Sequence, residues 1–133
     1  MPVSLISWPS GNTGTSMRRH ALIIEDEVLI ALEMELLLGE LGFRSFEVAD
    51  SPRDALESAR RARPDLITAD YRIIGGTGVE AVEAILAELG PIPVVYVTGN
   101  PDLVPGEGRP VVDKPIDCGA LAHACQSACP VLN

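Results

Sequence analysis

The sequence predicts an α/β protein with a doubly wound, five-stranded parallel sheet that carries helices on both faces. Short apolar segments alternate with longer amphipathic segments five times between His20 and Ala128. Such alternation is typical of a parallel sheet with helical crossovers. The chain has 133 residues, which suits one domain, and 47% of them are hydrophobic, which is enough to fill a core.

The five expected strands are short apolar or alternating segments. They cover residues 20–24, 43–49, 65–71, 93–98 and 110–112. Their length and apolar character fit buried strands. Right-handed crossovers bring the carboxyl ends of all five strands to one edge of the sheet, where the sites of such proteins lie.

Segments with helical spacing connect the strands. They cover residues 27–41, about 52–63, 79–89 and 115–128. Asp50 or Ser51 is placed to cap the second helix, with Pro52 in its first turn. In the first helix, which Gly42 ends, we assign one apolar row to the sheet. This row consists of Ile30, Met34, Leu37 and Leu41.

The fourth crossover breaks this pattern. Between Thr98 and Val111 the chain contains three prolines and three glycines. Prolines remove backbone donors and glycines raise the entropic cost of helix formation, so a full-length helix is unfavourable here. We expect a loop or a single turn, so the fourth helix is irregular or missing.

Composition restricts the remaining possibilities. The formal net charge of −9 disfavours nucleic acid as a partner. The sequence has no run of 18 apolar residues that would suggest a membrane span. It also lacks a secretory signal, so we expect a cytoplasmic protein. We interpret residues 1–17 as a disordered leader or a cloning remnant, residues 18–129 as the domain and residues 130–133 as a tail. Three cysteines near the C-terminus fit reduced thiols better than a disulfide framework.

Polar residues fall at four of the expected strand ends. They are Glu25 and Asp26 after the first strand, Asp70 after the third, Thr98 at the fourth and Lys114 after the fifth. Acidic side chains bind Mg²⁺ through oxygen while leaving positions open for phosphate. One carboxylate could attack phosphorus in line, while the hydroxyl and the ammonium bind the transferred oxygens. Two adjacent acids could also simply favour a helix start, but their coincidence with the other groups favours a phosphoryl-transfer site.

Lys114 is the only lysine of the chain, because the other nine basic residues are arginines. A compact ammonium suits a tight anionic site as a point charge. The alternative is that a single surface lysine has survived by chance. Its position after the fifth strand favours the functional interpretation.

These motifs in this order resemble the response regulator receiver domain over residues 19–128. The matching segments are LIIEDE (22–27), DLITADYRIIGGTGVE (65–80), VTG (97–99) and DKP (113–115). The resemblance implies a flavodoxin-like (βα)5 fold with strand order 2-1-3-4-5. It also implies a Mg²⁺ or Mn²⁺ site made by Asp26, Asp70, Glu25 and the backbone carbonyl of Arg72.

The resemblance further implies that Asp70 accepts a phosphoryl group, that Thr98 is the switch hydroxyl and that Lys114 is the charge partner of the phosphoryl group. One departure is Val111, which stands where receivers carry an aromatic switch residue. The segment PVVYVTGN (93–100) is similar to the Pro-Phe-x-Phe-Ala-Thr-Gly-Tyr signature of an alphaproteobacterial subgroup. That subgroup lacks the aromatic switch and works with HWE-type or related histidine kinases.

A second apolar row on the first helix consists of Leu29, Leu32 and Leu36. A helix packed on a sheet buries one stripe, so we expect this row to face solvent and to bind a helix of a kinase or an output protein. Self-association through the row and coverage by the leader are the alternatives.

Taken together, the sequence predicts a stand-alone receiver in two-component signalling. A histidine kinase or a phosphotransfer protein would supply the phosphoryl group, and output would pass through protein contacts or phosphate removal. One rival is a degenerate receiver that only binds partners. The other is an aspartyl-phosphate phosphatase, which typically carries a second acid where this chain has Arg72.

Overall fold

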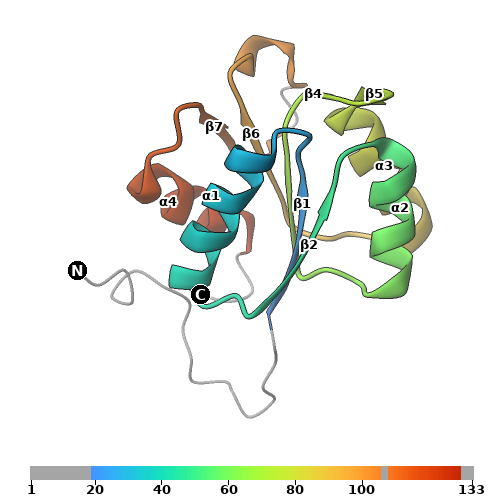
Figure 1. The fold of residues 1–133 in the computed structure, drawn as a ribbon, viewed down its shortest axis with the longest axis horizontal. Helices are drawn as coiled ribbons and strands as arrows, with labels where there is room; N and C mark the ends of the chain where they lie inside the picture. Colours follow the sequence, from blue (N-terminus) through green and yellow to red (C-terminus); the bar gives the residue numbers. More distant parts are fainter. Residues whose placement is uncertain (1–18, 106–107, 130–133) are drawn as a thin grey trace.

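Five parallel strands form the sheet of the computed structural model, which describes residues 19–105 and 108–129 (Figure 1). The strands are β1 (His20–Ile24), β2 (Ser45–Ala49), β3 (Leu66–Ala69), β6 (Val94–Thr98) and β7 (Val111–Asp113). Their order is β2-β1-β3-β6-β7. Apart from two very short strands, this is the expected order 2-1-3-4-5, and the predicted fold class is confirmed.

Alternation along the strands divides the core into two clusters. In β1, Ala21 and Ile23 belong to one cluster, whereas Leu22 and Ile24 belong to the other. Successive side chains of a strand point to opposite faces. Because both faces of the sheet are covered, a strand such as β1 is apolar along its length instead of alternating with polar residues.

Helices cover both faces of the sheet. Figure 1 shows α1 (Val28–Glu40) and α4 (Cys118–Ala128) on one face, and α2 (Pro52–Arg61) and α3 (Gly78–Leu89) on the other. Ser51 caps α2 by accepting a hydrogen bond from the N–H of Asp54. Asp117 caps α4 in the same way, so this helix begins three residues later than we expected. Likewise, α2 ends at Arg61 instead of Arg63.

The buried face of α1 differs from the predicted one. Ala31, Met34, Leu38 and Leu41 are buried against the sheet, whereas Ile30 and Leu37 are only partly buried. The helix is apolar on nearly every side, so spacing alone could not fix its rotation, and the small side chain of Ala31 now lies against the sheet. The second apolar row is exposed, as predicted.

Two connections shape the edge of the sheet where the strands end. The connection after β3 contains a small antiparallel pair, β4 (Arg72–Ile73) and β5 (Gly76–Thr77), and α3 begins directly after it. In the fourth crossover the described residues contain one 3₁₀ turn, η3 (Pro101–Leu103), which confirms the prediction of an irregular element. The predicted leader and tail lie outside the described residues. In the described part of the chain, every helix is too short or too polar to reach across a lipid bilayer.

Candidate functional site

Three carboxylates meet where β1 and β3 end. Glu25, Asp26 and Asp70 each offer an oxygen, and these oxygens lie within 4.8 Å of one another. Sheet hydrogen bonds fix this arrangement, because the N–H of Asp70 donates to the carbonyl of Ile24 at 3.0 Å. The three acids that the sequence singled out are therefore brought together.

Lys114 joins the cluster from the end of β7. Its Nζ lies 3.0 Å from Glu25 Oε1 and 3.0 Å from Asp70 Oδ2. Its backbone N–H donates to the carbonyl of Thr98 at 3.1 Å, and its peptide bond to Pro115 is cis. The only lysine of the chain thus bridges a buried acid and the candidate phosphoacceptor.

Burial and pairing perturb two of these groups. Burial raises the pKa of Glu25, although hydrogen bonds from Lys114 and from the N–H of Glu27 act against it. Burial lowers the pKa of Lys114, but the hydrogen bonds to Glu25 and Asp70 outweigh this effect, and its pKa is raised. The lysine therefore stays charged, as a phosphoryl-binding group requires.

Thr98 lies at the end of β6 and is fully buried. Its Oγ1 accepts a hydrogen bond from the N–H of Asn100 at 3.0 Å. Asp70 Oδ1 accepts one from the N–H of Tyr71 at 2.7 Å. The contact between Thr98 and Asn100 was not predicted, because the sequence does not show where a strand-end hydroxyl points.

Gly78, the first residue of α3, is a structural requirement of the site. A Cβ at this position would lie 1.9 Å from the backbone oxygen of Asp70. The glycine therefore allows α3 to approach the backbone of Asp70 closely. Thr77 and Glu80 form a capping box at the same helix start, with two hydrogen bonds of 3.0 Å. The pattern Thr-x-x-Glu in the sequence could have revealed it.

The acid cluster has the chemistry of a magnesium or manganese site. Carboxylate oxygens are the preferred ligands of hard divalent cations. Lys114 contacts both Glu25 and Asp70, whereas Asp26 is partly exposed in the same cluster, so Asp26 is the most available ligand. Arg72 lies in β4 just after Asp70, and ligation by its carbonyl stays a prediction.

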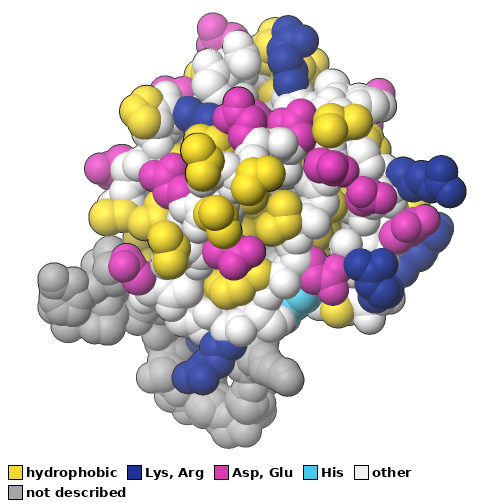
Figure 2. All heavy atoms as spheres, viewed as in Figure 1, with side chains coloured by type: hydrophobic (Ala, Val, Ile, Leu, Met, Phe, Trp, Pro, Cys, Tyr) yellow, Lys and Arg dark blue, Asp and Glu magenta, His cyan; other side chains and the backbone are white. Residues whose placement is uncertain are grey.

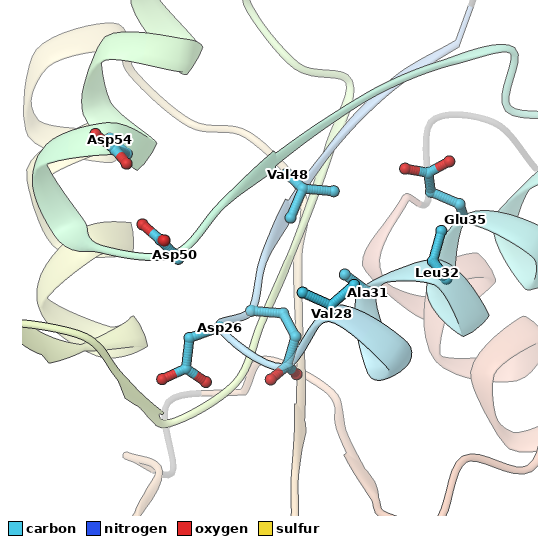
Figure 3. A pocket seen from close by; sticks show the side chains of 9 residues that line it. Asp26, Val28, Ala31, Leu32, Glu35, Val48, Asp50 and Asp54 are labelled. Carbon is cyan, nitrogen blue, oxygen red and sulfur yellow. The ribbon is translucent and has the colours of Figure 1, made fainter.

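A groove of about 290 Å³ starts beside the acids and runs between α1 and β2. Figure 3 shows Val28, Ala31 and Leu32 facing Val48 across it, with Asp26 and Asp50 toward the other end. The sequence analysis missed this groove, because it depends on how the edge strand lies against the helix.

Comparison with known proteins shows the family to which the chain belongs. A family model described as the response regulator receiver domain matches residues 21–125. The chain belongs to this family. It is therefore a receiver domain of two-component signalling.

Similar proteins place the chain near the alphaproteobacterial regulator PhyR. It is 38% identical to PhyR of Methylorubrum extorquens over 88 residues, which are 65% of this chain and 33% of that protein. The receiver domain of PhyR from Erythrobacter litoralis is 30% identical, with a TM-score of 0.76 over 87% of this chain and 93% of that one. PhyR from Bartonella quintana, described as an anti-anti-sigma factor, is 28% identical, with a TM-score of 0.74 over 89% of this chain and 50% of that one. The predicted resemblance to this subgroup is confirmed, and the chain spans a third to about half the length of its first curated relatives.

Proposed function

We propose that this receiver domain accepts a phosphoryl group on Asp70 in a Mg²⁺-dependent reaction. The arrangement of Asp70 carries the proposal. One of its oxygens contacts Lys114, and its carboxylate shares a cluster with Glu25 and Asp26 at the open edge of the sheet. Glu25 shares both features but is buried, whereas Asp70 is only partly buried and is therefore the more accessible acceptor.

The reaction transfers phosphorus from a donor nitrogen to a carboxylate oxygen. An Asp70 oxygen forms the new bond to phosphorus while the bond from phosphorus to the phosphohistidine nitrogen breaks, and the histidine ring keeps the electron pair and takes up a proton. A bound Mg²⁺ would neutralise charge on the phosphoryl oxygens. Lys114 would move its contact from Asp70 to a phosphoryl oxygen. The Thr98 hydroxyl would exchange its contact with Asn100 for a hydrogen bond to a phosphoryl oxygen.

The donor in this proposal is a histidine kinase, in keeping with the subgroup an HWE-type kinase, or a phosphotransfer protein. Output would pass through contacts with a further protein, and Leu29, Leu32 and Leu36 would form the contact row on α1. Leu32→Glu should slow transfer from the kinase about tenfold, as loss of one anchor residue does, and leave labelling by a small phosphodonor unchanged. Unchanged transfer from the kinase would remove the row from the interface.

Labelling with acetyl phosphate tests the acceptor directly. The parent chain should gain one phosphoryl group in Mg²⁺ and none in excess chelator, and Asp70→Asn should gain none. Asp113→Asn is the matched control, because Asp113 lies at the same edge of the sheet but outside the acid cluster. Label that persists in Asp70→Asn would exclude Asp70, and a parent that gains no label would favour the degenerate, binding-only receiver.

A further inference from the structure

The exposed side of α1 is unusually apolar. Five apolar side chains form what we call the leucine face: Val28, Leu29, Leu32 and Leu36 of α1, and Val48 of β2. Their exposed fractions run from 43% at Val48 to 78% at Leu29. Figure 2 shows apolar side chains gathered on this side of the molecule with acidic side chains around them. Contiguous apolar patches on a soluble domain mark contact surfaces.

Acidic groups surround the leucine face. The groove between α1 and β2 is bordered by Asp26, Glu35, Asp50 and Asp54 (Figure 3). A hydrogen bond with Asp50 raises the pKa of Asp54, which fits two acids that crowd each other. An occupant of this face must therefore be apolar and must not bring further acidic groups.

A second copy of the chain fits this requirement poorly. In a two-fold dimer the same patch faces itself, so the acidic border of one copy would meet that of the other. The chain also carries a net charge of −9, which adds long-range repulsion between copies.

Residues 1–18, which precede the described part of the chain, have the complementary composition. They contain Val3, Leu5, Ile6 and Trp8 and none of the 19 acidic residues. Their only charged side chain is that of Arg18. This segment can thus supply apolar contacts to the leucine face without charge repulsion.

The segment also enters the domain at a suitable place. The carbonyl of Arg19 accepts hydrogen bonds from the N–H groups of Arg44, which precedes β2, and Ser45, the first residue of β2. The eleven peptide links from Trp8 to Arg19 can span up to about 35–40 Å. The 13-residue helix α1 is only about 20 Å long, so the segment can reach any part of the leucine face.

We propose that residues 3–8 bind the leucine face of their own chain when no partner is present. A short tether gives an effective concentration in the millimolar range, so a weak contact is sufficient. A partner helix must then displace the segment, which would make residues 1–18 an internal competitor for partner binding. The partner role rests on the proposed function, whereas the intramolecular contact does not require phosphorylation.

Trp8 is the only tryptophan and reports the contact directly. In the full chain its emission should be shifted to shorter wavelength and shielded from acrylamide. Leu32→Glu should lower the ratio of bound to free segment about tenfold, as loss of one anchor residue does, and increase quenching accordingly. Leu103→Glu is the matched control, because Leu103 is exposed on η3, away from the leucine face. The Trp8 emission of this variant should equal that of the parent.

Three outcomes of the Trp8 measurements would overturn the proposal. They are a Trp8 spectrum that matches free tryptophan, equal effects of the two leucine variants, and shielding that disappears on dilution, which would indicate a second copy.

A second measurement is independent of Trp8. A chain that starts at Met17 should bind more of a dye for apolar surfaces than the full chain, and Leu32→Glu in the short chain should reverse the gain. Equal dye binding by the two chains would also contradict the proposal. Failure of these tests leaves labelling of Asp70 untouched, so the two proposals are tested separately.

Discussion

The two faces of the sheet are closed in different ways. On the α2–α3 face, polar contacts join the helices and the connections behind them. Arg60 binds Glu88 through two hydrogen bonds of 2.6 and 2.7 Å, and Arg63 donates to the carbonyls of Leu89 and Pro91. No large apolar side chain of α2 or α3 is exposed.

The α1–α4 face buries its inner side equally well but leaves its outer side apolar. Leu38 of α1 and Cys125 of α4 are fully buried in the same core cluster. On the outside of α1, however, Leu29 and Leu36 remain exposed. The difference is that α2 and α3 leave no large apolar side chain exposed, whereas α1 keeps an apolar outer side, which is the contact surface that we propose.

Thiol reactivity gives the largest expected contrast within the α1–α4 face. Burial raises the pKa of Cys125 and of Cys129 to about 12, so each holds about a thousandfold less thiolate than an ordinary thiol. Cys118 is exposed at the start of α4. Alkylation of the folded chain, mapped by mass spectrometry, should label Cys118 alone, and all three cysteines should react in denaturant. Labelling of Cys125 as fast as Cys118 would mean that this face is open beneath α4.

Truncation of two leucines tests the two sides of α1. Leu38→Ala removes a fully buried side chain and should lower the free energy of unfolding by about 3 kcal/mol. Leu36→Ala, two residues earlier and exposed, should change it by less than about 0.5 kcal/mol. Urea unfolding measures the free energy of unfolding of both variants. Similar losses would show that the outer row also packs against the domain.

A methyl group at Gly78 tests the close approach on the α3 side. Gly78→Ala forces its new Cβ against the backbone oxygen of Asp70 and should cost about 2–3 kcal/mol of unfolding free energy. It should also slow acetyl phosphate labelling, because the collision displaces Asp70. Gly99→Ala is the control, because a Cβ there meets nothing within 4 Å. Equal stability of the two variants would contradict the tight contact between α3 and the site.

The sequence alone specified most of the fold and the chemical groups of the site. Short apolar segments at regular intervals required a parallel sheet, because only buried strands tolerate such continuous apolar character. Parallel crossovers then had to bring Glu25, Asp26, Asp70, Thr98 and Lys114 to one edge. The prolines and glycines between Thr98 and Val111 likewise excluded a regular fourth helix. Their effect on helix formation acts through the local backbone and needs no tertiary contact.

The tertiary structure decided what local patterns leave open. The rotation of α1 was one such feature, since several apolar rows competed and packing against the sheet selected Ala31, Met34 and Leu38. The requirement for glycine at position 78 was another, because it arises from the carbonyl of Asp70 across a connection. The groove beside Val48 was a third, because it forms only when an edge strand and a helix from different parts of the chain lie together. Each of these features depends on contacts between distant segments, which spacing within one segment cannot encode.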